Sequence, residues 1–199
     1  MALPTAETLS RVASESAQSF VEHFYDALDK RRPLAPFYAS TSARLAGAGV
    51  KPDISINGKV LSPDGGVAEY EAMLDAQGRP VAYEVTSFDA HPVVPHYVLG
   101  EPDPAGGSSS AKVKDGDAMS FAVQVSGVVK YGRGGGGGGA NSGAKDGRGA
   151  IFGGGSKADV VEKGFNEAFL LVPHWEAWAR NAPRNLRKWV IVSQNFRAL

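Results

Sequence analysis

Three segments in the second half of the chain alternate between apolar and other side chains, a pattern that restricts the fold more than any other feature. They are 119–131, 165–172 and 188–197, and the similar segment 81–94 precedes them. A period of two is typical of β-strands that bury one face. The pattern therefore predicts a run of antiparallel strands.

The first half of the chain is predicted to be mainly helical. Apolar residues recur at steps of three and four over 6–28, which predicts a long amphipathic helix. Lys30-Arg31-Arg32-Pro33 marks its end, because cations are favoured at the carboxyl end of a helix and proline prevents its continuation. Shorter helices are predicted at 34–39 and 67–74. Helices followed by antiparallel strands predict an α+β domain with the helices packed on one face of a curved sheet.

A β-hairpin is predicted between these helices, over 42–61. Short strand patterns occur at 43–46 and 54–56, and Asn57-Gly58 is a strong signal for a tight turn. Pro92, near the end of the long segment that follows, indicates that this strand lies at an edge or bends.

Glycine is concentrated in one part of the chain. Thirteen of the 25 glycines lie between residues 132 and 155, where apolar side chains are almost absent. Such a stretch cannot bury enough surface to offset the entropy lost on ordering. We therefore predict a single domain, 1–199, with flexible loop insertions at 100–116 and 132–163. Linkers are the preferred interpretation of both loops, with docking sites as the alternative.

The overall composition excludes several classes of function. Lys plus Arg and Asp plus Glu both total 21, so no basic excess indicates a dedicated nucleic-acid binder. RNA contact is expected only on a surface shared with a partner. The absence of cysteine excludes disulfides, Cys-based zinc sites and a cysteine nucleophile. No apolar run approaches the ~18 residues of a membrane span and no leader is recognised, so a cytosolic or nuclear protein is expected.

Alternation divides the predicted strands into two faces of different composition. The predicted core face carries Phe121, Val123, Val125, Phe165, Phe169, Leu171, Val190, Val192 and Phe196. The opposite face, to which Ile191 is also assigned, is a mixture of small, apolar and polar residues with very little charge. Charge depletion of this kind is typical of the centre of a protein interface. The predicted partner-binding residues are Gln124, Ser126, Asn166, Ala168, Ser193, Asn195 and Arg197. The alternative is a cover formed by the chain's own loops.

No motif in the sequence predicts catalysis or a cofactor. Gly153-Gly-Gly-Ser-Lys157 has serine before lysine, so it does not match a phosphate-binding loop, and the four histidines lack metal-ligand spacing. We predict no metal and no cofactor. None of the residues assigned to the core face titrates, which argues against a catalytic cleft. Glu84 and Asp89, with Tyr25 and Tyr38, leave a pocket enzyme of the isomerase or dehydratase type as an alternative.

Both ends of the chain resemble a known family. Ser16–Arg32, followed by Leu34 and Phe37-Tyr38, resembles the first helices of nuclear-transport-factor-two-like domains. Gly164–Leu171 and Trp189–Arg197 resemble that family's last two strands. Asp29-Lys-Arg-Arg32 and the Phe165-Asn-x-x-Phe169 strand are most similar to the small subunit of the mRNA export receptor, the fungal mRNA transport regulator (Mtr) type.

This resemblance implies a cone-shaped fold and a role that depends on a partner. A member of this group is expected to be non-catalytic and to pair through its sheet face with the large subunit of the export receptor. Arg197 is expected to meet an acidic residue of that partner. The heterodimer is expected to bind phenylalanine-glycine-repeat nucleoporins and to carry messenger ribonucleoprotein through nuclear pores, between nucleus and cytoplasm.

A second member of the same family offers an alternative function. The resemblance also admits a homodimeric import factor for Ran-GDP. Gly132-Arg133 and the glycine tract occupy the place of that factor's acidic residues, which argues against Ran binding.

Overall fold

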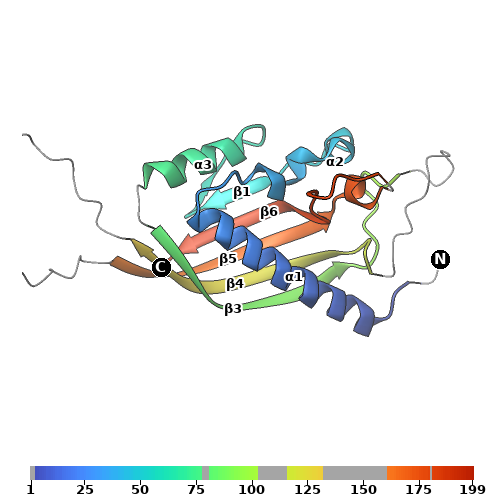
Figure 1. Cartoon of the computed structure of the whole chain (residues 1–199), viewed down its shortest axis with the longest axis horizontal. Helices are drawn as coiled ribbons and strands as arrows, with labels where there is room; N and C mark the ends of the chain where they lie inside the picture. The colour runs from blue at the N-terminus through green and yellow to red at the C-terminus, as the bar shows by residue number, and fades with distance from the viewer. Residues whose placement is uncertain (1–2, 78–80, 103–115, 132–160, 180) are drawn as a thin grey trace, which may run out of the picture.

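The fold consists of helices packed on one side of a curved, open sheet (Figure 1). The computed structural model describes residues 3–77, 81–102, 116–131, 161–179 and 181–199. Most of the two predicted loop insertions, 103–115 and 132–160, lies outside the described residues. Residues 161–163, which were predicted to belong to the second loop, form the start of a strand instead.

The predicted amphipathic helix is confirmed as α1, Ala6–Asp29. Thr5 forms its N-cap and accepts a hydrogen bond from the Thr8 N–H at 3.2 Å. Its buried stripe includes Phe20 and Phe24, which meet Phe169 of the sheet edge-on with ring centroids 4.9 and 5.1 Å apart. In the described part of the chain, no helix is long and apolar enough to cross a membrane.

Short helices follow α1 and confirm two of the predictions. Two 3₁₀ turns, Ala35–Phe37 and Ala39–Thr41, occupy the second predicted helix, and α3 spans Gly66–Ala76. A further 3₁₀ turn, Trp175–Trp178, precedes the last strand. Figure 1 shows α1 lying across the sheet, with α3 at the opposite edge from β3.

The predicted hairpin is half correct. Residues 43–46 were predicted to be a strand, but they belong to a short helix, α2, Ala43–Gly47. Ser42 is a good N-cap, whose Oγ accepts from the Leu45 N–H at 3.2 Å, and alanine, arginine and leucine are strong helix formers. The remainder forms β1, Asp53–Ile56, and β2, Lys59–Val60, around an Asn57-Gly58 turn in which both residues have positive φ.

The sheet has six strands in the order β2-β1-β6-β5-β4-β3. The four long strands are β3, Val81–Val94; β4, Ser120–Tyr131; β5, Val161–Pro173; and β6, Trp189–Ala198. They pair antiparallel with their neighbours. The predicted antiparallel run is thus confirmed, but the short strand β1 pairs parallel to β6. No short turn links these two strands, so no turn dictates their relative direction.

One irregularity changes which face the start of β6 presents. Leu170 lies opposite Ser193, but Leu171 lies opposite Ile191, so one residue of β6 is unpaired. Such a bulge exchanges the faces of the residues before it. Ile191 is therefore fully buried in the main core, and its predicted place on the opposite face was wrong. Val190 and Val192 were both predicted on the core face, but Val190 belongs to a second buried cluster around Trp175 and the partly buried Val192 packs against that cluster.

Candidate partner-binding face and buried carboxylate network

All seven predicted partner-binding residues lie on the sheet surface that faces away from α1, here called the outer face. Strand register sets them in rows across the sheet: Ser126–Asn166–Arg197 and Gln124–Ala168–Asn195, with Ser193 opposite Leu170 in a third row. Ser126 and Ser193 are half-buried, and the other five residues are exposed. Inside this face, the Ser126 hydroxyl donates to Asn166 Oδ1 at 2.7 Å.

Charge is confined mainly to the margins of the outer face. On the edge strand β3, Asp89 lies opposite Gln124 and pairs with His91 at 3.1 Å. On β1, Asp53 lies opposite Ser193. At the far end, Lys130 Nζ lies 2.5 Å from Glu84 and 3.8 Å from Glu162. The centre thus presents amides, hydroxyls and methyl groups, which cost less to desolvate than charged groups when another protein covers them.

Among the described residues, Arg197 is the one charged side chain inside this margin. A Cβ added at Gly58 would lie 3.3 Å from Arg197 Nη1, so the guanidinium lies over the β1–β2 turn. The Asn57 side chain accepts from the Ala198 N–H at 2.8 Å, which fixes the turn against the end of β6. No ion pair joins Arg197 to another described residue. A positioned cation of this kind can accept a carboxylate from outside the chain in a bidentate pair.

The inner face contains an ionisable group that the sequence analysis did not identify. Glu167 shares the alternation of Phe165 and Phe169, so its side chain points into the core, where only 1% of its surface is exposed. The statement that the core face carries no titratable residue was therefore wrong. Strict alternation along β5 was the signal that could have found Glu167.

Hydrogen bonds connect this carboxylate to neighbours from several elements. The Tyr25 hydroxyl of α1 donates to Glu167 Oε2 at 2.5 Å, and Gln194 Nε2 of β6 donates to Oε1 at 2.6 Å. The Tyr38 hydroxyl then donates to Gln194 Oε1 at 2.5 Å. All four side chains are buried. The network joins α1, β5, β6 and the segment between the two 3₁₀ turns.

Burial and hydrogen bonding act on Glu167 in opposite directions. Burial raises the pKa of Glu167 to about 7, although the bonds from Tyr25 and Gln194 favour the ionised form. Burial, together with the nearby carboxylate, also raises the pKa of Tyr25 and Tyr38, so both phenols stay protonated donors.

The residues of the alternative enzyme site are not brought together. Glu84 and Asp89 are exposed at the margin of the outer face, whereas Tyr25 and Tyr38 lie in the core. A groove between α1 and β3 is lined by Val21, Glu22, Tyr25, Tyr83, Val85, Thr86, Ser87 and Phe88. It contains neither of the two proposed carboxylates. Among the described residues, no cluster of three or more histidine, aspartate or glutamate side chains could hold a metal ion.

The basic triplet after α1 forms a helix end, as predicted. Lys30 pairs with Asp26 at 2.6 Å, and Arg32 also pairs with Asp26. Arg31 has a φ of 50°, and the N–H groups of Arg31 and Arg32 bond to the carbonyls of Leu28 and Ala27. This is the Schellman arrangement, in which glycine usually occupies the left-handed position.

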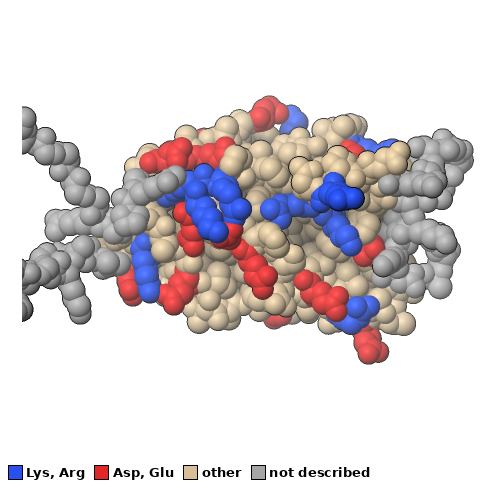
Figure 2. Space-filling view, in the orientation of Figure 1, with Lys and Arg blue, Asp and Glu red and all other residues tan. Residues whose placement is uncertain are grey.

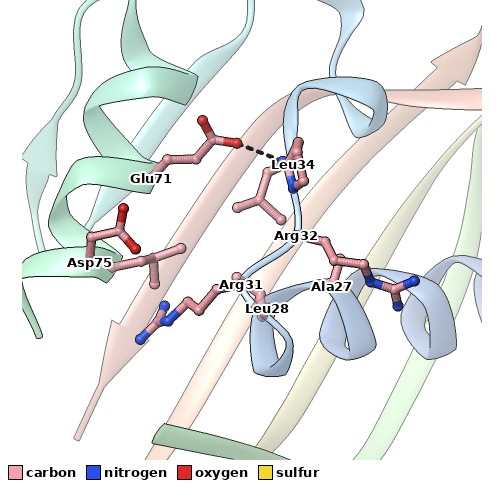
Figure 3. Close-up of a pocket in the computed structure, with 9 residues that line it drawn as sticks. Ala27, Leu28, Arg31, Arg32, Leu34, Glu71 and Asp75 are labelled. Atoms are coloured by element: carbon pink, nitrogen blue, oxygen red, sulfur yellow. Dashed lines mark hydrogen bonds between the residues drawn. The ribbon is translucent and has the colours of Figure 1, made fainter. Parts of the chain in front are cut away.

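A pocket of about 200 Å³ lies between this helix end and α3 (Figure 3). Glu71 of α3 reaches across it and accepts from the Leu34 N–H at 2.6 Å. Arg32 points away from Glu71 and Asp75 in the view of Figure 3. Glu71 therefore links α3 to the segment that follows α1.

Charged side chains are abundant on the helical side of the molecule. Figure 2 views this side and shows acidic and basic groups intermingled over it. Ion pairs of the helices include Arg11–Glu15 within α1, at 3.2 Å, and Glu69 of α3 with Lys59 of β2, at 2.6 Å. The contrast with the centre of the outer face sets that face apart as the candidate interface.

Several of the solved structures similar to this chain contain Mtr2. The structure of a Sac3N peptide bound to Mex67:Mtr2 matches with a TM-score of 0.70 and 30% identity, covering 94% of this chain and 99% of that chain. The Chaetomium thermophilum Mex67 NTF2-like domain complexed with Mtr2 gives a TM-score of 0.69 and 30% identity over 94% and 98%. A structure of Mtr2 gives 0.67 and 27% over 94% and 99%. No protein-family model and no curated protein matches the sequence.

The helix-covered, open sheet is the fold of the NTF2-like class. A putative dehydratase of the NTF2-like family from Streptomyces avermitilis shares this fold, with 13% identity and a TM-score of 0.54, covering 95% of this chain and 98% of that chain. Within that class, the chain belongs to the Mtr2 family. The resemblance at both ends of the sequence is thereby confirmed.

Proposed function

We propose that this chain is the small, non-catalytic subunit of a heterodimeric nuclear mRNA export receptor. It pairs through its outer face with the NTF2-like domain of a Mex67-type large subunit. The observation that carries the proposal is the likeness to Mtr2 in Mex67:Mtr2 complexes, which extends over almost the whole length of both chains. The exposed, uncharged centre of the outer face supports the same conclusion.

The heterodimer would act at nuclear pores and move between nucleus and cytoplasm. Binding to phenylalanine-glycine-repeat nucleoporins, and to RNA, would belong to the assembled pair, because this chain has no net charge. The Ran-GDP importer and the pocket enzyme rank behind this function, since no arrangement of the described residues favours either one.

The first experiment is co-expression with the NTF2-like domain of Mex67. The two chains are expected to co-purify, and the mass of the complex is expected to equal the sum of one copy of each. A stable monomer that does not bind this domain, or a homodimer that binds Ran-GDP, would refute the proposal.

Arg197→Glu tests the outer face directly. Reversing a desolvated charge next to a matched acid is expected to weaken heterodimerisation by at least the ~2–5 kcal/mol typical of breaking a buried pair. Affinity is measured by isothermal titration calorimetry and the fold by circular dichroism. Arg11→Glu makes the same charge change on the exposed side of α1 and is expected to leave affinity unchanged. Equal affinities for the two variants would mean that the interface lies elsewhere.

A further inference from the structure

The buried carboxylate and the outer face belong to the same strand. Glu167 lies between Asn166 and Ala168 in β5, and its backbone pairs with Phe196, the neighbour of Arg197. Its side chain points to the core while those of Asn166 and Ala168 point to the outer face. One layer of backbone therefore separates the carboxylate from the surface where the partner is proposed to bind.

No buried cation faces Glu167 from any described element packed against it. Tyr25 of α1 and Gln194 of β6 donate to it, and the hydroxyls of Tyr70 of α3 and Tyr83 of β3 lie within its electrostatic reach. Tyr38 reaches it through Gln194.

Two charged groups act on the tyrosines around Glu167. Glu71 acts electrostatically on Tyr38, and Arg31 acts on Tyr83. The charge of Glu167 is therefore balanced mainly by hydrogen-bond donors.

The two charge states of Glu167 are consequently close in free energy. All three hydrogen bonds of the network run towards the carboxylate, so the ionised form is well satisfied. The protonated form needs an acceptor and must turn a Tyr25 hydroxyl or a Gln194 amide. Burial opposes the ionised form because the core solvates charge poorly, and the pKa lies at about 7.

Covering the outer face with a partner would favour the protonated form of Glu167 over the ionised form. A partner removes water from the far side of β5, so the ionised carboxylate loses distant solvation. An acidic residue brought to Arg197 adds negative charge next to Phe196, the register partner of Glu167. Both effects disfavour a second negative charge at this place in the sheet.

We propose that Glu167 is a proton-binding site coupled to heterodimer formation, so that association with the large subunit is accompanied by proton uptake. This inference rests on the proposed function, because it requires the partner on the outer face. By linkage, affinity would rise as pH falls through the neutral range. The network would then make assembly of the receptor sensitive to pH without any titrating residue at the centre of the interface.

Calorimetry in several buffers measures the coupling. The full chain is titrated with the Mex67 NTF2-like domain near pH 7, in phosphate, imidazole and Tris. The dependence of the observed enthalpy on the buffer's ionisation enthalpy gives the number of protons taken up. A rise of about half a pH unit in the pKa of Glu167 gives an uptake of about a quarter of a proton.

Variants separate Glu167 from other titrating groups. Glu167→Gln keeps the shape and is expected to abolish this uptake, because every other group is the same in the two proteins. Glu22→Gln, an exposed change on α1, is expected to leave the proton count unchanged.

Tyr25→Phe provides a test that does not depend on whether the Glu167→Gln variant folds. It removes a donor to the ionised form and is expected to move the midpoint of uptake to higher pH. Heterodimers that form normally with no uptake across roughly pH 6 to 9, or with the same uptake in Glu167→Gln, would overturn the inference. Failure to form any heterodimer would instead contradict the proposed function.

Discussion

Glu167 is a fully buried acid without a buried base beside it in the described structure, and its environment gives the molecule an unusual dependence on pH. Its pKa rises from 4.5 to about 7 in the folded protein, so the folded state binds the proton more tightly than the unfolded chain. The sign of the effect follows from that order. The contribution of Glu167 to stability is most favourable below about pH 4.5, declines as pH rises towards 7, and is constant above.

Glu167→Gln is expected to remove this decline. Between about pH 5 and pH 8, wild-type stability should fall relative to Glu167→Gln by about 2 to 3 kcal/mol, at about 1.36 kcal/mol per pH unit. Urea denaturation at both pH values measures the difference. Taking the difference between the two proteins cancels every other titrating group, so parallel pH profiles would contradict a buried, poised carboxylate.

Arg31 shows a second local conflict, in its backbone. A left-handed φ of 50° is unfavourable for a side chain with a Cβ, and Nη1 and Nη2 of its buried guanidinium lack hydrogen-bond partners in the described structure. Arg31→Gly is therefore expected to stabilise the protein by about 1 kcal/mol in urea denaturation. Lys30 has ordinary helical φ and ψ, so Lys30→Gly should destabilise it. Loss of stability in both variants would show that Arg31 contributes net packing.

At the scale of elements, hydrophobic periodicity predicted most of the architecture. The long helix, the four long strands and the Asn57-Gly58 turn follow from local patterns. The short helix at 43–47 was missed because its capping by Ser42 was outweighed by a brief apolar alternation. The parallel pairing of β1 with β6 could not be predicted, because it depends on residues far apart in the sequence.

The candidate site was predictable to the extent that strands are regular. Alternation placed the seven outer-face residues together, since β4 and β5 pair without interruption across Gln124, Ser126, Asn166 and Ala168. It failed for Ile191, because a bulge in β6 has no clear sequence signal. The network around Glu167 requires contacts among four separate segments, which no local pattern reveals.

At position 127, β4 requires glycine because there is no room for a side chain. A Cβ there would lie 2.3 Å from the Glu84 carbonyl oxygen and 2.7 Å from the Phe165 ring. Gly127→Ala is expected to destabilise the sheet by about 1–3 kcal/mol, because backbone and core ring must both move. On the neighbouring strand, a Cβ at Gly164 would make ordinary contact at 3.6 Å, so Gly164→Ala should be nearly neutral in the same urea titration. If Gly127→Ala proved as close to neutral as Gly164→Ala, β3 and β4 would have to adjust freely around the added methyl group.

At the scale of the whole molecule, charge is divided between two sides. The helical side carries intermingled acids and bases (Figure 2), while the centre of the outer face is uncharged apart from Arg197. The net charge of zero gives no long-range attraction to steer a partner. Association through the outer face should therefore depend on shape and desolvation.

The heterodimer is consequently expected to be insensitive to salt. Raising NaCl from roughly 0.1 M to 1 M, which shortens the Debye length from about 10 Å to 3 Å, should change Kd by less than about threefold. Surface plasmon resonance at several salt concentrations measures this, and Arg197→Ala should flatten the remaining dependence further. A tenfold or larger loss of affinity would indicate an electrostatic interface and contradict the proposed use of this face.

The pairing of β1 with β6 has a consequence for how the chain folds. Asn57, at the end of β1, bonds to Ala198, 141 positions later. Because a ribosome makes the chain from its N-terminus, β1 and β2 cannot pair with β6 until residues 189–198 have emerged. Contacts this distant slow folding. The sheet of the newly made protein would therefore stay incomplete until β6 is available, and an early encounter with chaperones or a partner would protect the unfinished edge.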